Sequence, residues 1–285
     1  MGRQGCVVDG GSYLRFVALG DSQTEGLGDG DDVVGLRGWA DRLAEHLAAH
    51  SPGLRYANLA VRGKRAAQVR DDQLAPALSL RPDVATVVAG VNDVLRPRFD
   101  ADEVAAHLEA MFAALTAQGA RVATLTFPTR LAALGRPLGS RLVALNQRIR
   151  EAAGRHGVAV AECAGHAVIT DPRLWSADRL HASPLGHERI AAAVAHALAL
   201  PGSDDSWSGP LEPAAEAALS GPRAVVEELR WAATFLGPWL ARRLRGRSSG
   251  DGRTAKRPHL LPVFPPLSGG AAERPAVGDA SPIAP

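Results

Sequence analysis

Apolar and polar positions along the first 200 residues follow two alternating patterns. Short apolar runs rich in β-branched residues have the character of buried parallel strands; they lie at 14–19, 55–61, 83–89, 121–127 and 158–161. Apolar residues recur every three or four positions, as on one face of a helix, over 36–50, 102–118, 140–156 and 183–200. This alternation predicts a parallel sheet covered by helices on both faces.

Three residues mark the expected ends of these helices. Asp102 precedes a helical stretch and has the chemistry of an N-cap, while Gly119 and Gly157 are typical helix stops. In sheets of this kind, reactive groups lie in the loops at the carboxyl ends of the strands. Polar residues at those positions are therefore the candidates for function.

The composition changes near residue 200, because residues 201–285 hold 12 of the 20 prolines. The stretch 201–210, PGSDDSWSGP, consists mostly of Pro, Gly, Ser and Asp, which are typical of linkers. We divide the chain into an N-terminal arm (1–12), an α/β domain (13–200), a linker (201–221), an amphipathic basic helical segment (222–247) and a Pro/Gly-rich tail (248–285). Low hydrophobicity and abundant Pro and Gly predict that this tail is disordered.

The segment 222–247 has apolar residues at helical spacing and ends in four arginines, with Pro238 inside the pattern. We expect this helix to dock on the α/β domain or on a second subunit. Contact with a membrane surface or with a protein partner are the alternatives.

Composition excludes several classes of protein. The chain has 285 residues, 46% of them hydrophobic, and a net charge of only +2, which gives no general attraction for nucleic acid. Two cysteines, Cys6 and Cys163, cannot make a disulfide framework. Neither a membrane-spanning apolar run nor a signal peptide is recognisable, so we expect a cytoplasmic protein.

Three short motifs follow strands or precede the last helix. They are GDSQTEG at 20–26, GVND at 90–93 and DRLH at 178–181. Each alone is ordinary turn or helix-entry chemistry. Asp178 and His181, however, are three residues apart, so the carboxylate can hold the imidazole in one tautomer.

Together the motifs supply a serine, an amide donor, an acid and a base. In this combination the sequence resembles the SGNH/GDSL hydrolase family, with NLAVRG at 58–63 as its second block. The resemblance covers roughly residues 13–200. It implies a flavodoxin-like three-layer α/β/α fold around a mainly parallel five-stranded sheet, with no metal or organic cofactor.

The resemblance also implies a role for each matching residue. Ser22 would be the nucleophile, His181 the base, and Asp178 the acid that orients His181. An oxyanion hole would consist of the backbone N–H groups of Ser22 and Gly63 and the side-chain amide of Asn92. The reaction would be hydrolysis of a small-molecule carboxylic ester through an acyl-enzyme on Ser22.

Two other functions stay open. One is O-acyl transfer at the same site, and the other is a non-catalytic binding protein that uses the C-terminal helix. The compact domain favours short acyl chains. Three cations surround Gly63 in the second block, namely Arg62, Lys64 and Arg65, and we expect them to face solvent.

Overall fold

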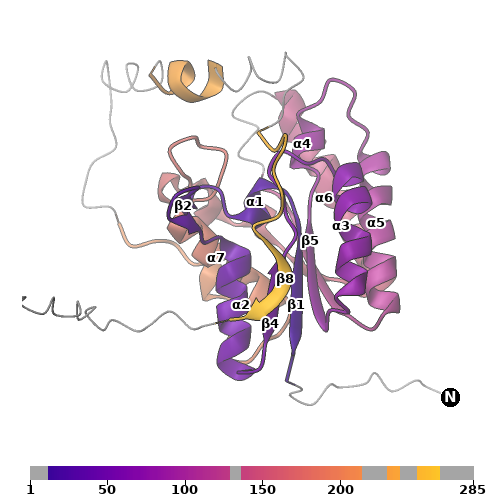
Figure 1. Cartoon of the computed structure of the whole chain (residues 1–285). Coiled ribbons are helices and arrows are strands. Elements are labelled where there is room, and N and C mark those ends of the chain that lie inside the picture. The colour runs from indigo at the N-terminus through magenta and orange to yellow at the C-terminus, as the bar shows by residue number, and fades with distance from the viewer. Residues whose placement is uncertain (1–11, 129–135, 214–229, 238–248, 264–285) are drawn as a thin grey trace, which may run out of the picture.

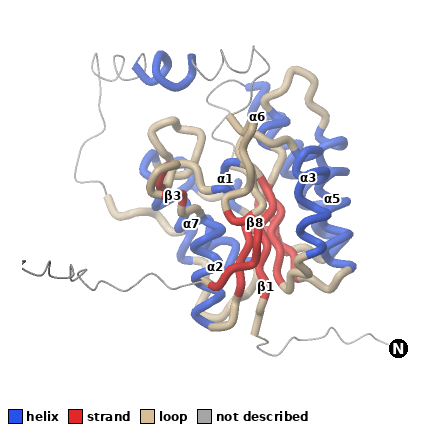
Figure 2. Tube along the Cα trace, viewed as in Figure 1, coloured by secondary structure: helices blue, strands red, loops and turns tan. Residues whose placement is uncertain are grey.

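A computed structural model describes residues 12–128, 136–213, 230–237 and 249–263 (Figures 1 and 2). Its centre is a six-stranded sheet in the order β7-β6-β5-β1-β4-β8. The strands are β1 (Arg15–Gly20), β4 (Arg55–Asn58), β5 (Val84–Val88), β6 (Arg121–Leu125), β7 (Ala159–Ala161) and β8 (Arg257–Pro262). Neighbouring strands pair in parallel except for β8, which pairs antiparallel with β4.

Helices cover both faces of the sheet, as the strand–helix alternation predicts (Figure 1). One face carries α2 (Trp39–His50) and α7 (Pro184–Ala197), which pack against each other. The other face carries α3 (Ala66–Ser79), α5 (Ala101–Ala117) and α6 (Arg136–His156). The molecule is therefore a three-layer α/β/α structure.

Shorter elements lie in the loops between the main helices and strands. They are α1 (Ser22–Glu25), α4 (Val91–Val94), the hairpin of β2 (Gly30–Asp31) and β3 (Gly35–Leu36), the 3₁₀ turns η2 (Cys163–Gly165), η3 (Ala167–Thr170), η4 (Pro172–Leu174) and η5 (Ser206–Ser208), and the π-helical turn η6 (Ala232–Leu236). Both α1 and α4 begin directly after a central strand, so they stand at the carboxyl edge of the sheet.

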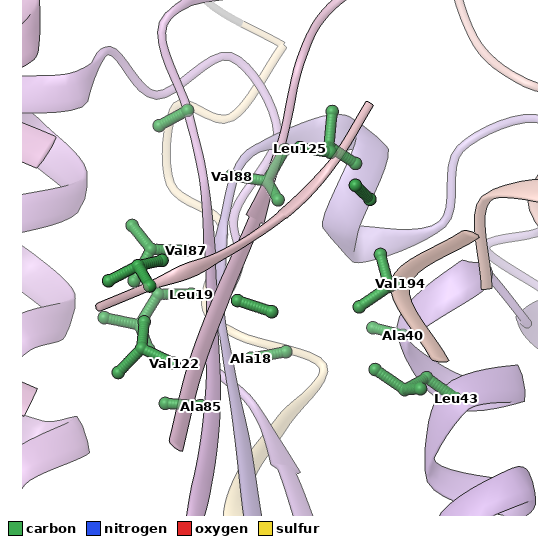
Figure 3. Packing of buried hydrophobic residues seen from close by; sticks show 14 of the residues in the cluster. Ala18, Leu19, Ala40, Leu43, Ala85, Val87, Val88, Val122, Leu125 and Val194 are labelled. Carbon is green, nitrogen blue, oxygen red and sulfur yellow. The ribbon is translucent and has the colours of Figure 1, made fainter. Parts of the chain in front are cut away.

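Burial of both faces of the sheet explains why each strand is a continuous apolar run in the sequence. Alternate residues of a strand face opposite sides of the sheet, and both sides are covered here. Figure 3 shows Leu19 with Val87 and Val122 on one side, and Ala40 and Leu43 of α2 on the other. All five side chains are buried.

Several sequence predictions are confirmed. All five predicted strand regions form parallel strands. Gly119 and Gly157 follow the last residues of α5 and α6 with φ of +86° and +64°. These left-handed conformations are the usual reason for glycine at a helix end.

Other predictions are wrong. The N-cap of α5 is Asp100, whose Oδ1 accepts hydrogen bonds from the N–H groups of Asp102 and Glu103, so Asp102 already lies inside the helix. Helix α3 was not predicted, because its apolar residues follow no clear helical stripe and Pro76 interrupts them.

The tail shows the largest difference. The expectation of disorder from Ser248 onward is wrong for residues 257–262, which form β8 and add a sixth strand to the predicted five. The linker also packs on the domain, since Trp207 is buried with its ring edge against His166. Of the predicted basic helical segment, only residues 230–237 lie within the described residues. No helix in the described parts of the chain combines the length and the apolar character needed to span a membrane.

Candidate active site

The predicted site residues lie in loops at one edge of the sheet. Ser22 is the first residue of α1, directly after β1, and Asn92 lies in α4, directly after β5. Gly63 lies in the turn after β4, and the loop 178–181 leads into α7. Parallel strands end at the same edge, so the topology brings together residues that are far apart in the sequence.

Three of these side chains form a continuous chain of hydrogen bonds. His181 Nε2 lies 2.8 Å from Ser22 Oγ, and His181 Nδ1 lies 2.6 Å from Asp178 Oδ2. All three side chains are half-buried. The structure thus places Ser22, His181 and Asp178 in the relation that the motifs predict.

Asp178 sets the tautomer of His181. Burial alone would raise the pKa of this carboxyl, but hydrogen bonds from the side chain and backbone of His181 and from Ser176 hold it well below its usual range. Asp178 is therefore ionised and can only accept hydrogen bonds, so His181 Nδ1 carries the proton. The unprotonated Nε2 then faces the hydroxyl of Ser22.

A residue of the C-terminal region touches this loop. Trp231 Nε1 donates to the carbonyl oxygen of Asp178 at 3.3 Å, and the guanidinium of Arg179 lies 4.8 Å from the Trp231 ring centre. Arg179 has φ of +58°, a left-handed conformation that is uncommon for residues other than glycine. Arg179 thus combines an uncommon backbone conformation with a cation–π contact to Trp231.

Gln73, a residue of α3, fixes the turn that carries Ser22. The side-chain amide of Gln73 spans Gly20: its Oε1 accepts from the Gly20 N–H at 2.8 Å, and its Nε2 donates to the Gly20 carbonyl at 2.9 Å. Gln73 is buried. Sequence reasoning missed this residue, because nothing local distinguishes it from a solvent-facing glutamine.

Asn92 links the first and second motif blocks. Its Nδ2 donates to Asp21 Oδ2 and to the carbonyl oxygen of Lys64, both at 3.1 Å. The latter contact places the amide beside Gly63, which has φ of +77°. Through these two acceptors Asn92 contacts the residue before Ser22 and the residue after Gly63.

Two carboxyl groups in the same region have raised pKa values. Burial raises the pKa of Asp21 to about 7, against lowering contributions from the Gln23 N–H, His181 and Asn92. Burial also raises the pKa of Asp93, whose Oδ2 accepts from the Ala66 N–H at 3.0 Å. Clusters of carboxyls with raised pKa values are common at functional sites.

The expectation that all three cations around Gly63 face solvent is wrong for Arg62. Its side chain is buried and forms an ion pair with the equally buried Glu25, with Nη2 2.6 Å from Oε1. Lys64 pairs with Asp72 at the surface, and Arg65 is exposed. Pairing with Glu25 is what allows an arginine to be buried here.

Two further titratable side chains are buried outside the hydrogen-bond chain of Ser22, His181 and Asp178. His187 is buried, with Nδ1 accepting from the Trp39 N–H at 3.1 Å and Nε2 donating to the Leu27 carbonyl at 2.9 Å. Burial lowers the pKa of His187 to about 4. Cys163 is buried as well, which raises the pKa of its thiol to about 12.

An apolar cavity of about 70 Å³ adjoins the loops of the site. Four of its lining residues are chain neighbours of the residues described above: Gln23, Val91, Leu180 and Ala182. Its remaining wall is mostly aromatic and aliphatic and includes Trp39 and Trp207.

The sequence profile of the GDSL-like lipase/acylhydrolase family matches residues 18–189. That range includes Ser22, Gly63, Asn92, Asp178 and His181. No curated protein matches the chain significantly.

Solved structures share the fold. LAE5, an alpha/beta hydrolase enzyme from the metagenome of Lake Arreo, Spain, is 23% identical with a TM-score of 0.57, over 67% of this chain and 97% of its own. A catalytic mutant of Axe2, an acetylxylan esterase from Geobacillus stearothermophilus, is 18% identical with a TM-score of 0.58, over 68% and 98%. A lipase/acylhydrolase from Enterococcus faecalis is 21% identical with a TM-score of 0.53, over 64% and 94%.

Proposed function

The chain belongs to the GDSL-like lipase/acylhydrolase family, and on this basis we propose that it hydrolyses carboxylic esters through an acyl-enzyme on Ser22. The observation that carries the proposal is the continuous hydrogen-bond chain from Ser22 Oγ through His181 to Asp178. A serine hydroxyl is a weak nucleophile until an adjacent base removes its proton. The hydrogen bonds of His181 to Ser22 Oγ and to Asp178 support the roles of base and orienting acid for these two residues.

In the first half of the reaction, Ser22 Oγ attacks the ester carbonyl carbon while its proton passes to His181 Nε2. The tetrahedral intermediate then collapses, and the alcohol leaves with the proton that His181 holds. The ionised Asp178 stabilises the imidazolium that exists between these two transfers. The products are a free alcohol and an ester of the acyl group with Ser22.

The second half repeats these steps with water as the nucleophile. His181 Nε2 takes a proton from water, the resulting hydroxide attacks the acyl carbon, and Ser22 leaves with that proton. The free acid dissociates and the serine hydroxyl is restored.

Three donors would stabilise the negative oxygen of both intermediates: the backbone N–H groups of Ser22 and Gly63 and the Nδ2 of Asn92. The proximity of Asn92 to the Gly63 turn, through the Lys64 carbonyl, supports this assignment. The oxyanion would replace one of the two acceptors that Nδ2 contacts. Removing one such donor typically costs about 3–4 kcal/mol of transition-state stabilisation.

The apolar cavity supports a short acyl chain. A cavity of about 150 Å³ holds a benzene molecule, and this one has about half of that volume. We assign it to the acyl side because its walls include the chain neighbours of Ser22 and His181. Acetyl to butyryl groups would fit it, and long-chain acyl groups would not.

The test is a series of p-nitrophenyl esters from acetyl to palmitoyl, with the wild-type chain and Ser22→Ala. We expect the highest kcat/KM for the shortest chains and a loss of at least about 10³-fold in Ser22→Ala. Ser79→Ala is the control, since Ser79 is exposed at the end of α3. Retention of more than a tenth of the activity by Ser22→Ala would contradict the proposal.

The same assay distinguishes the alternatives. An O-acyltransferase would form a new ester when an alcohol or sugar acceptor is added, at the expense of the free acid. A non-catalytic binding protein would turn over no ester, and Ser22→Ala would then equal the wild type.

A further inference from the structure

A buried ion pair connects the nucleophile helix to the turn of Gly63. Glu25, the last residue of α1, accepts three hydrogen bonds from Arg62: from the backbone N–H at 2.6 Å, from Nε at 2.9 Å and from Nη2 at 2.6 Å. Glu25 therefore fixes both the side chain and the backbone of the residue that precedes Gly63. Hydrogen bonds to charged groups are stronger than hydrogen bonds between neutral groups.

The ion pair continues into the C-terminal region. Arg62 Nη2 also lies 2.9 Å from Asp32 Oδ1, and Asp32 in turn accepts from both Nη groups of Arg253, at 3.0 and 2.6 Å. Hydrogen bonds from Arg253 and Arg62 lower the pKa of Asp32 to about 2. Asp32 thus stays ionised and bridges the two arginines.

The backbone of the C-terminal region touches the same turn. Gly250 is buried, and a Cβ atom placed on it would overlap the carbonyl oxygen of Arg62. That oxygen belongs to the peptide unit whose N–H is the Gly63 donor. Because a trans peptide is planar, its C=O and N–H point in opposite directions, and fixing one fixes the other.

The segment 249–263 is itself anchored to the domain by other contacts. β8 pairs with β4, and Lys256 Nζ contacts Asp41 Oδ2 and the Leu36 carbonyl. In Figure 1 the segment runs down the edge of the sheet, from the end that carries α1 to β8. It lies outside the family match, which ends at residue 189.

We propose that Glu25, Arg62 and Arg253 are positioning residues, which together with the backbone of Gly250 orient the Gly63 N–H toward the oxyanion. The inference rests on the proposed function, because it assigns a purpose to the Gly63 donor. In this proposal the C-terminal segment 249–263 affects catalysis by positioning the Gly63 N–H, although it supplies no group that touches the substrate.

Two substitutions test the proposal. Gly250→Ala forces the Arg62–Gly63 peptide to move. Arg253→Ala removes the ion pair between Arg253 and Asp32. Both of these residues are exposed, so we expect this variant to fold. We expect kcat for p-nitrophenyl acetate to fall by about 10- to 100-fold in Gly250→Ala and less in Arg253→Ala, with KM within about twofold. Arg253→Lys should recover part of the loss, because it keeps the charge beside Asp32.

Two controls perturb the same segment without touching Arg62 or Asp32. Gly252→Ala adds a methyl group where φ is +72° and nothing lies within 4 Å. Lys256→Ala removes the contacts of the segment with Asp41 and the Leu36 carbonyl. Both should lower Tm while leaving kcat near the wild-type value.

A transition-state analogue separates positioning from loss of stability. Ser22 adds to the carbonyl carbon of a trifluoromethyl ketone and turns its oxygen into an oxyanion, with the proton passing to His181. The inhibition constant should rise in Gly250→Ala by about the same factor as kcat/KM falls. A merely structural role would leave this constant unchanged at temperatures where the variant is folded.

The outcomes separate the two proposals. If Ser22→Ala is inactive but Gly250→Ala and Arg253→Ala keep the kcat and the inhibition constant of the wild type, the positioning role is wrong and the proposed function stands. If the wild type and Ser22→Ala hydrolyse esters equally, the proposed function itself is wrong.

Discussion

One carboxylate decides which nitrogen of the imidazole faces the serine. Asp178 Oδ1 accepts from the N–H groups of Leu180 and His181 at 2.9 and 3.0 Å, so Oδ2 is left to hold His181 Nδ1. The four residues 178–181 therefore contain both the carboxylate and the imidazole that it holds. This local geometry is the reason that the spacing of Asp178 and His181 was informative in the sequence.

Asp178→Asn tests this arrangement. The amide can donate to Nδ1 and so favours the tautomer whose Nε2 carries a proton and cannot act as a base. We expect kcat for p-nitrophenyl acetate to fall by about 10²- to 10⁴-fold with little change in Tm. Activity within threefold of the wild type would mean that Asp178 does not set the tautomer.

Asp21 gives a prediction about pH and stability. Its pKa in the folded chain is raised to about 7 by burial, against an ordinary value of 3.8. Between these values the folded chain keeps a proton that the unfolded chain has released, so this group makes stability fall as pH rises through the window. Asp21→Asn has no proton to lose there and retains an N-cap oxygen for the Gln23 N–H.

The free energy of unfolding should therefore decline less in Asp21→Asn than in the wild type between pH 5 and 8. The difference should be on the order of 3 kcal/mol, because each pH step below the raised pKa is worth about 1.4 kcal/mol. Urea unfolding at several pH values measures it. Parallel pH profiles for the two chains would show that Asp21 is already ionised at pH 5.

Residues differ in how far the sequence could predict them. Ser22, Asn92, Asp178 and His181 lie in short motifs whose order along the chain carries the information. The pairing of Arg62 with Glu25 could not be predicted, because it depends on how the turn after β4 meets α1. An isolated arginine beside a glycine gives no sign that it will be buried.

At the scale of elements, the start of α5 offers a matched pair of variants. Asp100 caps the helix with two hydrogen bonds to backbone N–H groups, whereas Asp102 is exposed and pairs only with Arg148 within the described residues. Asp100→Ala should lower the free energy of unfolding by about 1 kcal/mol. Asp102→Ala should lower it by no more than about 0.5 kcal/mol.

Thermal unfolding of the two variants measures this difference, and kcat should be unchanged in both. Equal losses of stability would mean that the helix begins later than Asp100. Sequence reasoning chose the wrong one of two nearby aspartates, since both precede the same apolar pattern and either can cap a helix.

Two elements were missed for different physical reasons. Helix α3 is rich in polar residues and Ala, so its buried side chains form no apolar stripe. Strand β8 has only partly buried or exposed side chains, because it covers an edge of the sheet. Its sequence therefore lacks the apolar run of the central strands, and two prolines within it argue against a strand. An edge strand tolerates proline better than a central one.

At the scale of the whole molecule, the folded α/β unit extends beyond residue 200. The composition suggests a domain that ends there, yet β8 belongs to the same sheet, and Arg253 and Lys256 form ion pairs with residues of that domain. A chain that ends at residue 248 loses these contacts and exposes the edge of β4. A chain that ends at residue 263 keeps them.

We expect the shorter chain to have a Tm lower by about 5 °C or more, since each 1 kcal/mol shifts Tm by about 2–4 °C in a domain of this size. Its kcat should fall as well, because Arg253 and Gly250 are gone. The chain ending at residue 263 is the control for truncation as such. If both truncated chains retained the Tm and kcat of the full chain, the C-terminal segment would be dispensable.

The central claim is that Ser22 is the nucleophile of the family's reaction in this chain. Its most direct test is brief treatment of the full chain with a fluorophosphonate, followed by intact-mass measurement and peptide mapping. We predict one adduct per chain, located on Ser22, with slow or no labelling in His181→Ala and none in Ser22→Ala. Absence of any adduct, or an adduct on another residue with Ser22 unmodified, would contradict the account.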